Sequence, residues 1–72
     1  MKLVINMDSD MLNSKLIALN VDGKPIMDFQ HKVYGDKERK MILEIGGLYT
    51  KGEHTLELLL EKGLYKKYKF TL

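Results

Sequence analysis

Residues 52–72, GEHTLELLLEKGLYKKYKFTL, decide the fold, because two apolar runs meet here across a short polar break at 61–63. Residues 67–72 alternate lysine or threonine with an aromatic or leucine side chain. A period of two places one residue type on each face of a strand. Gly63 can adopt the positive φ that closes a short hairpin loop. The stretch therefore predicts a β-hairpin, whose apolar face the rest of the chain must cover.

The first arm of this hairpin contains Leu58-Leu59-Leu60, which breaks strict alternation. Such a run is typical either of a strand that is buried on both faces or of a local bulge. A helix over residues 54–62 is a further alternative, although the segment between the flanking glycines is short for a stable helix.

A second hairpin is predicted at Val21-Asp22-Gly23-Lys24. Asp-Gly between apolar runs is the strongest short-range signal for a two-residue hairpin turn, and it requires a strand on each side. We therefore expect strands over residues 14–21 and 25–29. Pro25 has no N–H, which places it at the start of a strand or on a sheet edge.

The segment before this turn also allows a different interpretation. Leucines at positions 12, 16 and 19 fit helical spacing, and Asp8-Ser9-Asp10 could cap a helix near residues 9–20. In that case the fold would be α+β with one helix.

The remaining segments favour more short strands. Residues 2–7 alternate with Leu3, Ile5 and Met7 on one face, and residues 41–45 alternate in the same way before a Gly-Gly pair. Residues 35–40 form a charged loop, and residues 30–34, which are mostly polar, receive no strand assignment. About six or seven strands with turn signals every eight to twelve residues predict an all-β fold: a small antiparallel immunoglobulin-like sandwich.

Length and composition limit the class of protein. The chain has 72 residues and no cysteine, with 44% hydrophobic and 31% charged residues, so we expect a single β-sandwich domain over residues 1–72. A domain this small buries a modest core and has no disulfide to reinforce it. Good packing or self-association must supply the stability.

The first residues, MKLVINMD, contain one lysine and an apolar run of only three residues. This is neither a signal peptide nor a membrane span, so we expect no membrane insertion. If Met1 is native, the predicted location is cytoplasmic; otherwise the chain would be an excised extracellular module.

Three stretches together resemble a known family. The sequences at 18–26 (ALNVDGKPI), 51–58 (KGEHTLEL) and 63–72 (GLYKKYKFTL) are similar to the layout of PEGA domains and related immunoglobulin-like bacterial surface modules. Residues 27–40 depart from that layout, which has a short Gly-Thr-Pro step there. The resemblance implies a non-enzymatic sandwich used for binding or spacing, and it assigns no functional residue.

No catalytic, cofactor-binding or metal-binding set is predicted. His31 and His54 are the only histidines, and neither has further ligands at metal-binding spacing, so both are interpreted as structural or exposed. Asp8-Ser9-Asp10 begins like a calcium loop, but Leu12 and Asn13 occupy the positions that would need an oxygen ligand and glycine. There is no cysteine and no Gly-x-Ser-x-Gly nucleophile motif. We therefore expect that the chain is not an enzyme.

The charge distribution draws attention to the C-terminal strand. Residues 1–60 hold eight Lys/Arg and nine Asp/Glu, whereas residues 61–72 hold four Lys and one Glu. The predicted interaction residues are Tyr65, Lys66, Lys67, Tyr68 and Lys69.

The first functional hypothesis is a protein-interaction or structural module that binds a protein partner or self-associates through this edge strand. The alternatives are a nucleic-acid-binding protein that uses the same lysines and tyrosines and a small phage-encoded inhibitor of a host protein. A simpler interpretation of the lysines is that they guard an exposed sheet edge.

Overall fold

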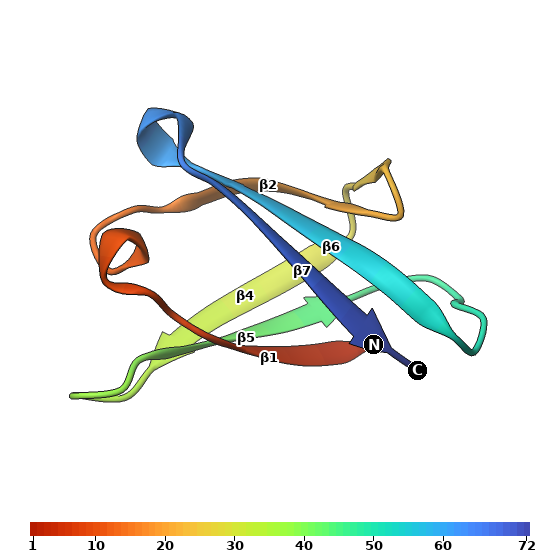
Figure 1. Cartoon of the computed structure of the whole chain (residues 1–72), viewed down its shortest axis with the longest axis horizontal. Coiled ribbons are helices and arrows are strands. Elements are labelled where there is room, and N and C mark those ends of the chain that lie inside the picture. Colours follow the sequence, from red (N-terminus) through yellow and green to blue (C-terminus); the bar gives the residue numbers. More distant parts are fainter.

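The chain forms two antiparallel sheets that pack face to face, which confirms the all-β sandwich prediction (Figure 1). The computed structural model describes residues 1–72. The three-stranded sheet has the order β1-β5-β4, with β1 (Lys2–Asn6), β5 (Lys40–Ile45) and β4 (Phe29–Tyr34). The four-stranded sheet has the order β3-β2-β6-β7, with β3 (Lys24–Ile26), β2 (Leu16–Val21), β6 (Glu53–Leu60) and β7 (Tyr65–Thr71).

Both predicted hairpins are present. β6 pairs with β7 from Glu53 opposite Thr71 to Leu59 opposite Tyr65, and the short 3-10 turn η2 (Glu61–Gly63) connects them. Lys62 and Gly63 both have positive φ, 63° and 72°, and Asp22 and Gly23 in the β2–β3 turn have φ of 52° and 78°. Two successive positive φ angles are typical of type I′ turns, whose twist matches that of paired strands.

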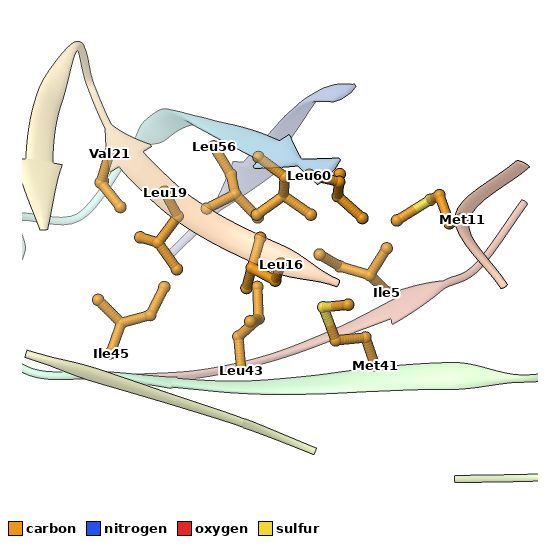
Figure 2. Packing of buried hydrophobic residues seen from close by; sticks show 11 residues of the cluster. Ile5, Met11, Leu16, Leu19, Val21, Met41, Leu43, Ile45, Leu56 and Leu60 are labelled. Carbon is orange, nitrogen blue, oxygen red and sulfur yellow. The ribbon is translucent and has the colours of Figure 1, made fainter. Parts of the chain in front are cut away.

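The core lies between the two sheets and is built from alternate residues of their central strands (Figure 2). Leu56, Leu58 and Leu60 of β6 are at most 1% exposed. They face the equally buried side chains of β5, so that each sheet removes the other's apolar face from water. The eleven buried hydrophobic residues are Ile5, Met11, Leu16, Leu19, Val21, Met41, Leu43, Ile45, Leu56, Leu58 and Leu60.

The prediction that Leu58-Leu59-Leu60 is buried on both faces is wrong. Leu59 is 43% exposed, so alternation continues through the run. The irregularity lies in the opposite strand instead, where the β2–β6 register shifts between Leu16 and Ala18. The alternative helix over 54–62 is also wrong, because β6 covers residues 53–60.

The helix alternative near residues 9–20 is wrong too. Only Ser9–Met11 are helical, as the single 3-10 turn η1, and the strand that was predicted over 14–21 begins at Leu16. The side chain of Met11 is fully buried at the edge of the core, next to Leu60 (Figure 2). The apolar residues whose spacing suggested a helix face thus do not share one element: Leu12 directly follows η1, whereas Leu16 and Leu19 are in β2.

Two strand boundaries differ from the expectation for residues 25–34. The strand expected over 25–29 ends at Ile26, and a separate strand, β4, covers Phe29–Tyr34. β4 was missed because it is an edge strand of a three-stranded sheet with exposed side chains at five of its six positions. Such a strand lacks the apolar alternation by which strands are recognised. Pro25 lies on the edge strand β3, as predicted.

Candidate interaction site at the edge of strand β7

β7 has one free edge, because it ends the order β3-β2-β6-β7. Gly52 and Leu72 exchange both of their backbone hydrogen bonds, at 3.2 and 3.0 Å. In an antiparallel ladder such pairs alternate with pairs that share no bond. The register therefore directs the N–H and C=O groups of Lys66, Tyr68 and Phe70 toward β6. Those of Tyr65, Lys67, Lys69 and Thr71 point outward, away from the sheet.

The same alternation divides the predicted interaction residues between two faces. Tyr65, Lys67 and Lys69 are exposed on the outer face of the sheet, whereas Lys66 and Tyr68 are half-buried on the inner face. The five residues are thus contiguous in sequence without forming one surface. Only the three outer side chains are presented together with the free backbone groups.

On the outer face, the carboxylates of β6 leave the lysines largely available. The hydroxyl of Tyr65 donates a hydrogen bond to Glu57, which raises the pKa of the tyrosine. Lys69 lies 3.5 Å from Glu53 with both side chains about two-thirds exposed, and exposed pairs of this kind are weak. Lys67 forms no ion pair, although Glu57 is directly opposite it in the register.

On the inner face, Lys66 and Tyr68 have structural partners. Lys66 Nζ lies 2.9 Å from Asp10 and 3.1 Å from Asp8, and these hydrogen bonds raise the pKa of the lysine. The Tyr68 hydroxyl donates to the sulfur of Met11 at 3.5 Å. These contacts tie β7 to η1 across the end of the sandwich. They also explain Asp8-Ser9-Asp10, whose carboxylates hold a lysine.

An apolar cavity adjoins the inner face of β7. It has a volume of about 270 Å³ and is lined mainly by hydrophobic residues of β1 and β7, including Leu3, Ile5, Tyr68 and Phe70. β1 is the edge of the other sheet. Two free sheet edges thus border one apolar seam on the same side of the molecule.

The structure also reveals a buried polar cluster around His54. His54 is 6% exposed, with Nδ1 2.6 Å from Asp22 Oδ2 and Nε2 2.7 Å from the carbonyl oxygen of Thr50. The other carboxylate oxygen of Asp22 accepts the backbone N–H of Thr55 at 2.9 Å. Phe70 stacks on the imidazole with ring centroids 5.4 Å apart. The cluster joins the β2–β3 turn to β6 and to the loop before it.

The hydrogen bond to Asp22, followed by that to Thr50, raises the pKa of His54. The bond to His54 is in turn the main cause that lowers the pKa of Asp22. The interpretation of His54 as structural is consistent with this environment. Asp22 as its partner was missed, because the Asp-Gly turn alone gave that residue a sufficient role. One sequence signal indicated that His54 points inward: Leu56 and Leu58, two and four residues later, lie on the same face of a strand.

No family model, curated protein or solved structure matches the chain. None of its helical turns has the length and apolar character to cross a membrane. The resemblance to PEGA domains therefore remains a prediction based on the residues that suggested it.

Proposed function

We propose that this chain is a non-enzymatic protein-interaction module that binds an extended segment of its partner by strand addition to β7. The observation that carries the proposal is the free edge of β7, a seven-residue strand with four outward-pointing pairs of backbone groups. Strand addition gains affinity from main-chain hydrogen bonds and specificity from alternate side chains. We also propose that the fold is related to the immunoglobulin fold. The strand order differs from the constant-type order in one respect: β2 lies in the sheet of β6 and not in the sheet of β1.

The other three edges offer less. β3 has only three residues and contains Pro25, which cannot donate a hydrogen bond. β1 has five residues and β4 has six. β7 is the longest edge strand, contains no proline, and borders the apolar cavity.

The self-associating form of the prediction has an electrostatic cost. A symmetric antiparallel pair of β7 strands with the longest overlap is centred on Tyr68, which places Lys67 of each copy opposite Lys69 of the other. Like charges directly opposite one another are destabilising. A different partner protein therefore fits the edge better than a second copy. A phage-encoded inhibitor would be one such binder, with its host protein as the partner.

Nucleic-acid binding through the same strand finds less support. Lys66 is held by two aspartates, and Glu53 and Glu57 alternate with the remaining lysines on the outer face. A phosphate backbone laid across this face would be repelled by these carboxylates as well as attracted by the lysines.

The test is selection of binders from a displayed library of random seven-residue peptides, followed by titration of the selected peptides into the ¹⁵N-labelled chain. Binding should be lost in Lys67→Pro, which removes an outward N–H but no β6–β7 hydrogen bond, and retained in the matched Lys67→Gln. Lys69→Pro serves as a second backbone variant should the first fail to fold. Peptides that bind Lys67→Pro and Lys69→Pro as tightly as the original chain would overturn the proposal.

A further inference from the structure

We propose that the segment recognised by β7 is an extended peptide in which acidic and apolar residues alternate. This inference rests on the proposed function, since it specifies the partner of the same edge. Three features of the structure define the pattern: the charges on the outer face, the apolar seam on the inner face, and the sequence of the strand that already pairs with β7.

The outer face selects for acidic side chains. A strand added to β7 places every second side chain on the outer face, next to Tyr65, Lys67 and Lys69. Cross-strand neighbours lie close enough for opposite charges to attract and like charges to repel. Lys67 forms no ion pair within the chain, and the only pair of Lys69 is solvent-exposed. Two carboxylates spaced two residues apart on the added strand would complement both lysines.

The inner face selects for apolar side chains. The remaining side chains of an added strand point toward the seam between β7 and β1, where Leu3, Ile5 and Phe70 line the cavity. Its volume of about 270 Å³ has room for several water molecules at the ~30 Å³ each occupies in the liquid. Replacing that water with aliphatic side chains removes apolar surface from solvent on both partners. A charged side chain here would be desolvated without a partner.

The strand on the other side of β7 already shows this arrangement. β6 places Glu57 opposite Lys67 on the outer face, and Glu53 contacts Lys69. On the inner face, the same strand buries Leu56, Leu58 and Leu60. On its paired side, β7 thus meets a strand with two glutamates beside its lysines on the outer face, where Thr55 and Leu59 occupy the other positions, and with buried leucines on the inner face. Its free side presents the same lysines and the same apolar face to a second strand of that kind.

The lysines that exclude a second β7 therefore admit an acidic strand. Lys67 and Lys69 would therefore have two roles: they would prevent edge-to-edge pairing of identical chains, and they would select an acidic partner. The other three edge strands, β1, β3 and β4, each contain a single lysine. Only β7 has exposed lysines at alternate positions next to an apolar cavity that is lined by strand residues.

The test uses three synthetic seven-residue peptides with blocked ends. The first has the sequence Glu-Val-Glu-Leu-Glu-Val-Glu, the second contains the same residues as an acidic block followed by an apolar block, and the third replaces every Glu with Lys. Calorimetric titration should give the alternating acidic peptide an affinity about tenfold higher than either control. The lysine peptide places like charges beside Lys67 and Lys69, and the block peptide must place glutamates against the apolar inner face. In ¹⁵N spectra, the amides of Lys67, Lys69 and Thr71 should shift more than those of Lys66, Tyr68 and Phe70.

A charge-reversed chain sharpens the result. The double variant Lys67→Glu, Lys69→Glu should prefer the lysine peptide to the glutamate peptide, which a general loss of folding would not produce. Equal affinity for the alternating and block peptides, or no inversion in the folded double variant, would overturn the inference. The library selection separates this failure from failure of the proposed function: binders that require the outward N–H of Lys67 but lack the alternation refute only the pattern. Binders insensitive to that N–H refute both.

Discussion

His54 Nδ1 lies 2.6 Å from Asp22 Oδ2, and the opposite ring nitrogen lies 2.7 Å from the carbonyl oxygen of Thr50. A carbonyl oxygen and an ionised carboxylate can only accept hydrogen bonds. Only the protonated imidazole can donate to both acceptors, so this pair of contacts favours the positively charged form of His54 and raises its pKa. This charged pair fastens the β2–β3 turn onto β6, immediately behind Phe70 of the edge strand β7.

The stability of the chain should depend on pH through this pair. In the folded chain the pKa of His54 is raised above 6.5. The contribution of His54 to the free energy of unfolding is therefore complete below pH 6.5 and is lost as the pH rises through the higher, folded-state pKa. The pKa of Asp22 is lowered from 3.8, so its contribution is present above 3.8 and disappears as pH falls through the lower value. Urea unfolding at a series of pH values should show the largest contribution of the pair between 3.8 and 6.5.

Asp22→Asn should remove most of the alkaline part of that dependence. Asparagine tolerates the positive φ of 52° at this position and can still accept a hydrogen bond from Thr55. It carries no charge, so His54 no longer gains a carboxylate partner when it is protonated. The variant should be less stable near pH 6 but flatter between pH 6 and 9. An unchanged pH profile for the folded variant would show that Asp22 does not set the protonation of His54.

Leu58→Ala and Leu59→Ala form a matched pair that tests the alternation in β6. Leu58 is fully buried and Leu59 is 43% exposed. Truncation of a buried leucine costs about 2–5 kcal/mol in the free energy of unfolding, whereas a surface change costs about 0.5 kcal/mol. Chemical denaturation of both variants measures the difference. Similar losses would mean that both faces of β6 are covered.

Gly63→Ala should destabilise the chain through the backbone alone. Gly63 has a φ of 72°, and no atom lies within 4 Å of the position that a Cβ would occupy. A left-handed conformation costs a non-glycine residue about 1–2 kcal/mol. Thermal unfolding should detect this loss, and a variant as stable as the original chain would contradict the type I′ geometry at the β6–β7 turn.

Residue pattern was sufficient to predict the fold wherever alternation or turn chemistry was strong. The Asp-Gly turn, the arms of the C-terminal hairpin and the strand at 41–45 were all recognised in this way. β4 was not, because an edge strand with exposed side chains has no apolar period to detect. The helix alternative near residues 9–20 arose because spaced leucines satisfy two periods at once, and only the sheet pairing of β2 distinguishes them.

The candidate site was predictable in part. Sequence indicated residues 65–69 by charge and aromatic content, and the alternation over residues 67–72 indicated a strand with two different faces. It could not show that Lys66 is held by Asp8 and Asp10, which are far from it in sequence. Nor could it show that β1 and β7 border a common apolar seam. Both facts depend on how the two sheets pack, which short-range patterns do not encode.

Residue-resolved amide hydrogen exchange along β7 tests most directly the claim that this strand has an available edge. In dilute solution, the amides of Lys66, Tyr68 and Phe70 should be protected by β6, while those of Lys67 and Lys69 exchange at rates close to those of unstructured chain. Addition of the alternating acidic peptide should then protect Lys67 and Lys69. Uniform protection along β7 in the dilute, unliganded chain would contradict the account, because it would mean that the outward groups are already paired.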